Sequence, residues 1–116
     1  MYILYLTTDL MFSSQVSGLV RAKGGESTVV STAADLIARA SAQEVALVIL
    51  DLSLAGLDSG QIVHALRAMK QAPQAILAYA PHVHEAKLAA AREAGCDQVL
   101  TRGGFHREIA SILDCL

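Results

Sequence analysis

The sequence predicts an α/β protein with a doubly wound, five-stranded parallel sheet and helices on both faces, which gives a three-layer αβα architecture. Two observations support this fold class. Short apolar runs recur five times along the 116 residues, and each is followed by a segment with helical periodicity rather than by another strand. Continuous apolar runs are typical of strands covered on both faces, and an intervening helix returns the chain for the next parallel strand through a right-handed crossover.

The strands are assigned first. Residues 2–6 and 45–50 are the clearest, because both runs are apolar throughout, and three weaker runs lie at 28–30, 75–79 and 98–101. Binding sites of such sheets form beyond the carboxyl ends of the strands. The segments expected to carry a site are therefore 7–9, 51–56, 79–82 and 101–104.

Boundary residues support the helices between these strands. Gly24 and Gly25 are expected to end the first helix. Asp58, with Gln61 three residues later, forms a capping-box pattern at the start of the third helix, and Pro73 stops that helix before the fourth strand. Apolar stripes at helical spacing mark three of the helices: Val16, Leu19 and Val20; Ile62, Val63 and Leu66; and Ile109, Ile112, Leu113 and Leu116.

The composition favours one domain over residues 1–116, since 53% apolar residues are ample for a single core. A net charge of -2 provides no field that would attract nucleic acid or an anionic membrane. No apolar run is long enough to span a bilayer and no signal peptide is evident, so we expect a cytoplasmic protein. Cys96 and Cys115 have no C-x-x-C spacing, and we expect free thiols that pack as small apolar side chains.

The segment after the third strand resembles a known family. Residues 51–58, Asp-Leu-Ser-Leu-Ala-Gly-Leu-Asp, are similar to the phosphoacceptor segment of response-regulator receiver domains, and residues 93–97 are similar to the turn before that family's fifth strand. The resemblance covers essentially the whole chain. It implies the flavodoxin-like (βα)5 receiver fold and a role in two-component, phosphorelay signal transduction, with Asp51 as the candidate phosphoacceptor.

The sequence departs from this family at its acidic pair. The two carboxylates that end the family's first strand fall on Thr7 and Thr8. Phosphoryl transfer to a carboxylate brings two anions together, and Mg2+ stabilises the charge of the transition state. Because neutral hydroxyls replace carboxylates poorly as Mg2+ ligands, we expect no bound metal, no cofactor and no catalytic residue. Asp9 is expected to cap the first helix.

The fifth strand also departs from the family. The lysine at its end matches Arg102, whose planar fork does not reproduce a compact ammonium group. The proline that usually follows is replaced by Gly103, and together with Gly104 it predicts a flexible loop. The two positions that usually convert phosphorylation into a change of shape fall on Tyr79 or Ala80, in place of a short hydroxyl, and on Val99, in place of an aromatic ring.

These departures together predict a pseudo-receiver that is not an enzyme. It would act by binding a signalling protein, such as a histidine kinase, an output domain or another regulator, through the fourth helix, fifth strand and fifth helix. A homodimer through the same face is the other candidate assembly.

Two other functions stay open. The chain could be a phosphoaccepting receiver that uses Asp51 with Mg2+ in a rearranged shell. It could also be a small-anion sensor, whose pocket would be bounded by Thr8, Asp51, Tyr79 and Arg102. Arg102 beside Gly103 and Gly104 offers a cation and backbone N–H groups to an anion, whereas His82 and His84 have no clear third residue to complete a metal shell.

Overall fold

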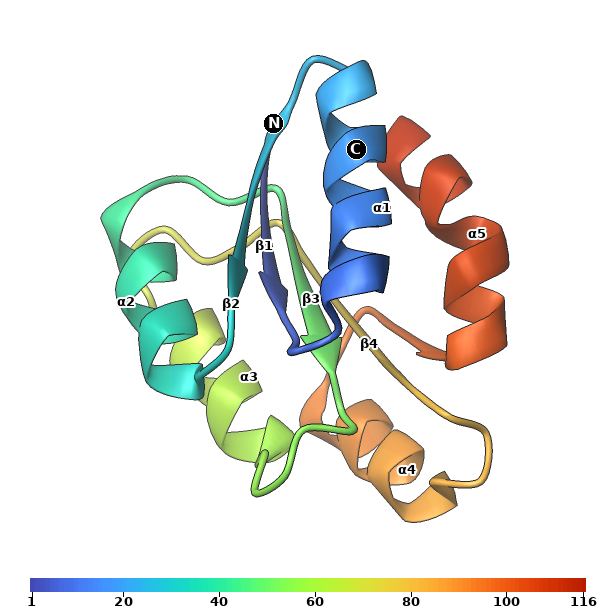
Figure 1. Cartoon of the computed structure of the whole chain (residues 1–116). Coiled ribbons are helices and arrows are strands. Elements are labelled where there is room, and N and C mark those ends of the chain that lie inside the picture. Colours follow the sequence, from blue (N-terminus) through green and yellow to red (C-terminus); the bar gives the residue numbers. More distant parts are fainter.

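Strands and helices alternate strictly along the chain in the computed structural model, which describes residues 1–116 (Figure 1). The five strands form one parallel sheet in the order β2-β1-β3-β4-β5. This confirms the predicted fold class. The strands are β1 Tyr2–Leu6, β2 Glu26–Val30, β3 Leu47–Asp51, β4 Ala75–Ala80 and β5 Gln98–Thr101, and the helices are α1 Leu10–Ala22, α2 Ala33–Ala42, α3 Ser59–Arg67, α4 Glu85–Ala94 and α5 Arg102–Asp114.

The core consists of two apolar clusters, one on each face of the sheet. One joins the sheet to α2, α3 and α4, and the other joins it to α1 and α5, which lie side by side in Figure 1. Successive residues of β1 alternate between them: Leu4 and Leu6 belong to the first cluster, and Ile3 and Tyr5 to the second. A strand buried on both sides needs apolar residues throughout, which explains the continuous runs in the sequence. None of the five helices has the length and apolar character needed to cross a bilayer.

The predicted boundaries of α1 and the predicted N-cap of α3 are present, but α3 ends at Arg67, so Pro73 is not what stops this helix. Asp9 caps α1 by accepting a hydrogen bond from the Phe12 N–H at 2.9 Å, and Asp58 caps α3 by accepting from the Gln61 N–H at 3.1 Å. After α1, Gly24 adopts a φ of +79°, a left-handed conformation that favours glycine. These local signals set where α1 and α3 begin and where α1 ends.

The prediction of a flexible loop at Gly103 and Gly104 is wrong. β5 ends at Thr101 and α5 begins at the next residue. The Thr101 hydroxyl caps the helix by accepting from the Gly104 N–H at 3.1 Å. A β-carbon on Gly104 would lie 3.2 Å from the Thr101 Oγ1, so glycine allows this close approach. Both glycines therefore form the first turn of a helix that continues directly from the strand.

The last residues of the chain also differ from expectation. The stripe of α5 buries Ile109 and Leu113, but Leu116 is 44% exposed and lies beyond the helix. Both cysteines are free thiols, as expected, yet only Cys96 packs against the core, whereas Cys115 is exposed. The helix ends at Asp114, so the residues after it no longer follow its buried face.

The turn into β5 is tied to its neighbours through Asp97. Its Oδ2 accepts hydrogen bonds from the Ile76 N–H at 2.7 Å and from the Arg67 guanidinium at 2.9 Å. Its own N–H donates to the Ile76 carbonyl at 2.8 Å. Asp97 thus joins α3, β4 and the start of β5.

Candidate functional site

Asp51 is the last residue of β3 and lies at the carboxyl edge of the sheet, with only 6% of its surface exposed. Its Oδ2 accepts a hydrogen bond from the Thr7 hydroxyl at 2.6 Å. Its Oδ1 accepts from the Ser53 N–H at 3.0 Å and from the Ser53 hydroxyl at 2.5 Å. Both carboxylate oxygens therefore have hydrogen-bond donors from the protein itself, as a buried charge requires.

Ser53 was not identified from the sequence. A local signal was present, because an aspartate side chain often accepts a hydrogen bond from the backbone N–H two residues later, and a serine at that position can add its hydroxyl. The resemblance pointed only to Asp51 and to Thr7 and Thr8, the positions of the family's acidic pair.

Thr7 and Thr8, at the positions of the acidic pair, lie in different environments. Thr7 is 2% exposed, and its hydroxyl donates to Asp51 while it accepts from the Asp9 N–H at 3.1 Å. Thr8 is exposed and has no hydrogen bond to Asp51. Only one of the two hydroxyls therefore belongs to the site, and it links the β1–α1 and β3–α3 connections.

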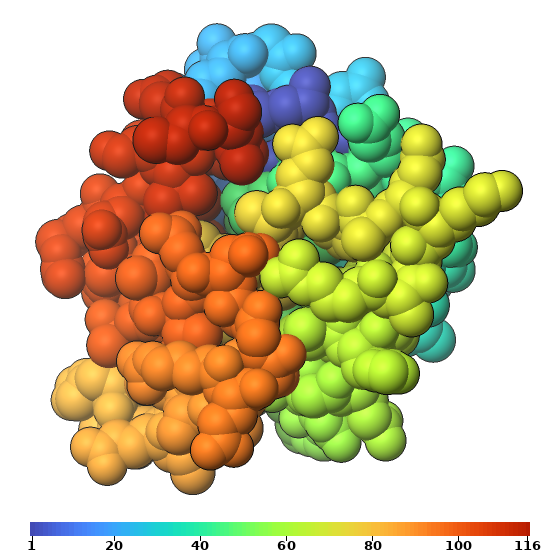
Figure 2. Space-filling model, turned by 180° about the vertical axis from the view of Figure 1, so that it is seen from behind, coloured from blue at the N-terminus to red at the C-terminus, as the bar shows by residue number.

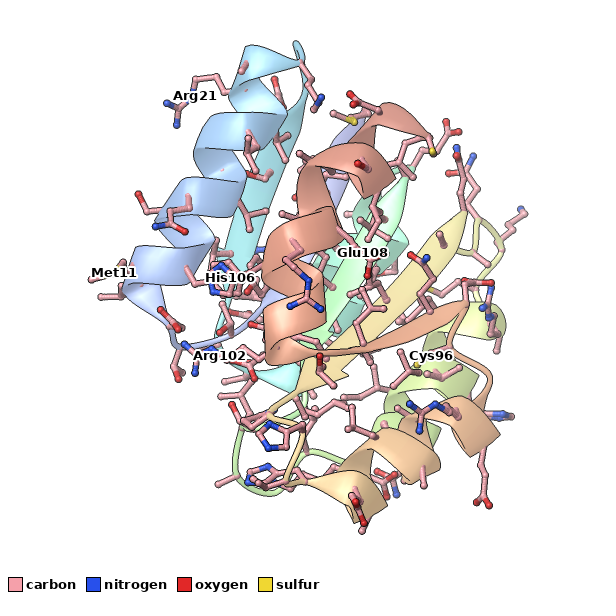
Figure 3. The ribbon with its side chains drawn as sticks, turned by 90° about the vertical axis from the view of Figure 1, so that its right-hand side faces the viewer. Met11, Arg21, Cys96, Arg102, His106 and Glu108 are labelled. Carbon is pink, nitrogen blue, oxygen red and sulfur yellow. The ribbon has the colours of Figure 1, made fainter.

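Arg102 contacts Asp9 rather than Asp51. Its Nη2 lies 2.7 Å from the Asp9 Oδ2, and the other oxygen of Asp9 caps α1. Figure 3 shows Arg102 at the junction of β5 and α5, beside the start of α1. Half of the Arg102 side chain is exposed, so the ion pair contributes little stability. The ion pair does orient the guanidinium of Arg102, the residue at the position of the family's lysine.

Tyr79 is part of a buried aromatic cluster with Tyr5, Phe12 and Phe105. The hydroxyls of Tyr5 and Tyr79 are 2.5 Å apart, and the Tyr79 ring stacks on Phe105 with 4.4 Å between ring centroids. Burial raises the pKa of both phenols well above their ordinary value of 10.0. The sequence showed four separate aromatic residues and gave no sign that two hydroxyls would pair in the core.

The other two switch positions face the opposite side of the sheet. Ala80 is fully buried in the apolar cluster that joins the sheet to α2, α3 and α4, and Val99 packs against the same cluster. Neither carries a hydroxyl or an aromatic ring. The structure thus brings together Thr7, Asp51 and Tyr79 near one edge, while Ala80 and Val99 serve the core.

The other candidate ligand sites are those at Arg102 and at His84. Arg102 is paired with Asp9 and the Gly104 N–H with Thr101, so the proposed anion cradle has lost its free cation and one donor. His84 occupies the N-cap position of α4 without a capping bond, and its buried Nδ1 has no partner. No three His, Cys, Asp or Glu side chains gather as a metal site requires. The oxygens of Asp51 and Asp9 already accept hydrogen bonds or an ion pair from neighbouring residues, so Mg2+ would compete with these donors.

We expect Thr7→Val to lower the free energy of unfolding by about 1–3 kcal/mol, because it leaves the buried Asp51 carboxylate without one donor. Thr8→Val is the matched control, and its exposed side chain predicts a change within about 0.5 kcal/mol. Urea unfolding of both variants measures the difference. Equal values for the two would mean that the 2.6 Å contact contributes nothing.

No protein-family model and no curated protein matches the sequence. Solved structures do match. The receiver domain of the TMAO respiratory response regulator TorR gives a TM-score of 0.83 at 18% identity, covering 98% of this chain and 93% of that domain. The receiver domain of the sensor histidine kinase PA1611 from Pseudomonas aeruginosa PAO1 gives 0.81 at 19%, covering 98% and 94%, and its structure holds a magnesium ion in the active-site cleft. Chemotaxis regulator CheY4 of Vibrio cholerae gives 0.80 at 16%, covering 99% and 98%.

These similarities assign the fold. The chain has the doubly wound α/β architecture of response-regulator receiver domains over nearly its full length.

Proposed function

We propose that this chain is a receiver-like module of two-component signalling that acts by binding a partner protein, without catalysis and without phosphorylation of Asp51. The observation that carries the proposal is the 2.6 Å hydrogen bond from the buried Thr7 hydroxyl to Asp51. It puts a neutral donor against the carboxylate at the position where the family has an acid. Asp51 then joins two connections of the sheet as a structural acceptor.

The chemistry of phosphoryl transfer supports this reading. A phosphodonor and a carboxylate repel each other unless a divalent cation lies between them, and that cation needs charged oxygen ligands. The only carboxylate near Asp51 along the β1–α1 connection is Asp9, which is held by Arg102 and by the α1 N-terminus. The receiver domain of PA1611 coordinates magnesium in its active-site cleft, and our proposal is that this chain does not.

The surface of α4 and α5 supports a partner protein as the ligand. Charges of both signs are exposed there: Lys87, Arg92 and Arg107, and Glu85, Glu93 and Glu108. Ala89 of α4 is exposed as well. Figure 2 shows this face, with α4 in light orange and α5 in red. A partner surface that carries charges of both signs would complement this face and could approach α4 closely at its small alanine side chains.

Intact-mass measurement after incubation with Mg2+ and acetyl phosphate tests the proposal. We expect no phosphoryl adduct that depends on Asp51, because no site assembles the metal beside it. Asp51→Asn is the control that separates phosphorylation of Asp51 from modification elsewhere. A stable adduct on the natural sequence that disappears in Asp51→Asn would establish the phosphoaccepting alternative instead.

The Thr7→Asp, Thr8→Asp double variant provides the opposite arm of the same experiment. It restores both acids, and we expect its thermal stability to rise with millimolar Mg2+ while that of the natural sequence does not change. The same stabilisation of the natural sequence by Mg2+ would contradict the proposal whether or not the variant folds.

A further inference from the structure

A groove of about 340 Å³ opens at the end of the sheet opposite Asp51, between the first residues of β3 and β4, the start of β5 and the last turns of α5. Its apolar wall includes Leu47, Leu77 and Ile112. Leu47 begins the strand that Asp51 ends, so at the rise of a parallel strand the two ends are about 13 Å apart. The groove is therefore separate from the site described above.

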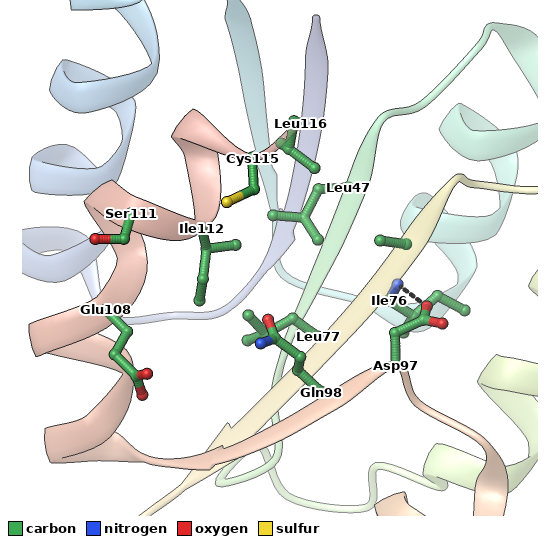
Figure 4. Close-up of a pocket in the computed structure, with 11 residues that line it drawn as sticks. Leu47, Ile76, Leu77, Asp97, Gln98, Glu108, Ser111, Ile112, Cys115 and Leu116 are labelled. Atoms are coloured by element: carbon green, nitrogen blue, oxygen red, sulfur yellow. Dashed lines mark hydrogen bonds between the residues drawn. The ribbon is translucent and has the colours of Figure 1, made fainter.

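The groove exists because α5 covers this face of the sheet incompletely. The helix begins directly at the end of β5 and buries Phe105, Ile109 and Leu113 against the sheet. Ile112 is only partly buried and faces the opening (Figure 4). Figure 2 shows the hollow between red α5, orange β5 and the yellow start of β4. A volume of this size lies at the lower end of the range for small-ligand pockets.

The charge around the groove has one sign. Asp97 and Glu108 are the only charged residues that line it, and no basic residue does. Asp97 pairs with Arg67, whereas Glu108 takes part in none of the three ion pairs of the chain. Glu108 extends from α5 on one side of the opening, with Asp97 on the other (Figure 4). The neutral polar side chains of Gln98 and Ser111 complete the rim.

We propose that this groove binds a small amphiphilic cation, with an aliphatic body and an ammonium or guanidinium group at one end. The aliphatic body is of roughly the size that pockets of this volume accept. The apolar body displaces water from Leu47, Leu77 and Ile112, and this burial supplies most of the affinity. The cationic end lies at the rim beside the unpaired Glu108 carboxylate. This inference does not depend on the proposed signalling function.

Hexylamine, hexanol and hexanoate are matched probes, because they share an alkyl chain and differ in charge. We expect hexylamine to bind several-fold more tightly than hexanol, and hexanoate to bind most weakly, when backbone amide shifts are followed by NMR. Shortening the amine should weaken binding by about four-fold for each buried methylene lost. Equal binding of the amine and the alcohol, or no binding of the amine at tens of millimolar, would overturn the proposal.

Two pairs of variants locate the ligand. Ser111→Trp, on the exposed rim, should close the groove and abolish binding, whereas Ala110→Trp, exposed but outside the groove, should not. Glu108→Gln should remove the preference for the amine over the alcohol and leave the binding of hexanol unchanged. Binding that survives in Ser111→Trp would place the amine elsewhere and refute the site.

A thiol measurement gives an independent readout. Cys115 lines the groove and is exposed, whereas Cys96 lies outside the groove. Bound hexylamine should slow the alkylation of Cys115 by iodoacetamide several-fold without changing the rate at Cys96, as measured on the separated peptides. Equal rates with and without the amine at saturating concentration would contradict binding in this groove.

Discussion

Phe105→Ala is expected to lower the free energy of unfolding by about 3–5 kcal/mol, the usual cost of removing a buried phenylalanine ring. Phe105 is fully buried, stacks on Tyr79, and meets Phe12 edge-on with 5.2 Å between centroids. Together with Ile109 and Leu113, it packs α5 against the sheet. Urea unfolding followed by circular dichroism measures the loss.

Leu10→Ala serves as the control for this prediction. Leu10 is an apolar residue of similar chemistry, but 80% of its surface is exposed. Its replacement should change the free energy of unfolding by no more than about 0.5 kcal/mol. If Phe105→Ala cost less than about 1 kcal/mol, the aromatic cluster would not be the tightly packed core described here.

The second large effect is a steep loss of stability above pH 10. Burial raises the pKa of Tyr5 and Tyr79 above their ordinary value of 10.0 in the folded protein. In the unfolded chain both phenols lose their protons near pH 10, while the folded protein keeps them. Each tyrosine then reduces stability by about 1.4 kcal/mol per pH unit, so the pair reduces it by about 2.7 kcal/mol per unit. The contribution is fully present below pH 10 and disappears as the pH rises toward the folded-state values.

The Tyr5→Phe, Tyr79→Phe double variant isolates this effect. It removes both hydroxyls together, so neither remains buried without its partner 2.5 Å away. Burial raises the pKa of Cys96 to about 11, but this thiol is present in both proteins and its effect cancels in the comparison. Urea unfolding at several values between pH 9 and 12 should therefore show a flatter decline for the double variant. Parallel curves would contradict the assignment.

Much of the fold could be predicted from the sequence because its signals are local. The apolar runs of β1 and β3 reflect burial on both faces, and the caps at Asp9 and Asp58 act within three residues. The junction at Gly103 and Gly104 could not be predicted in the same way. Two glycines are typical of a loop, and only the Thr101 hydroxyl, already in place at the end of β5, lets them begin a helix.

The contacts around Asp51 were not predicted, and neither was the presence of Ser53 among them. Asp51 and Thr7 were identified from the resemblance, and whether Asp51 is phosphorylated stays a prediction. The pairing of Arg102 with Asp9 joins residues 93 positions apart, and the pairing of Tyr5 with Tyr79 joins residues 74 apart. Such contacts depend on how the strands are ordered in the sheet, and neither composition nor periodicity contains that information.

Asp97 has a consequence for the edge of the sheet. β5 has only four residues, and its side chains are exposed or half-buried, so burial alone would permit the strand to slide along β4. Sliding by one residue would break all three hydrogen bonds that Asp97 makes to Ile76 and Arg67. Asp97 thereby fixes the register of the outermost strand. It also opposes the exchange of β5 and α5 between two molecules, a route by which edge strands lead to domain-swapped dimers.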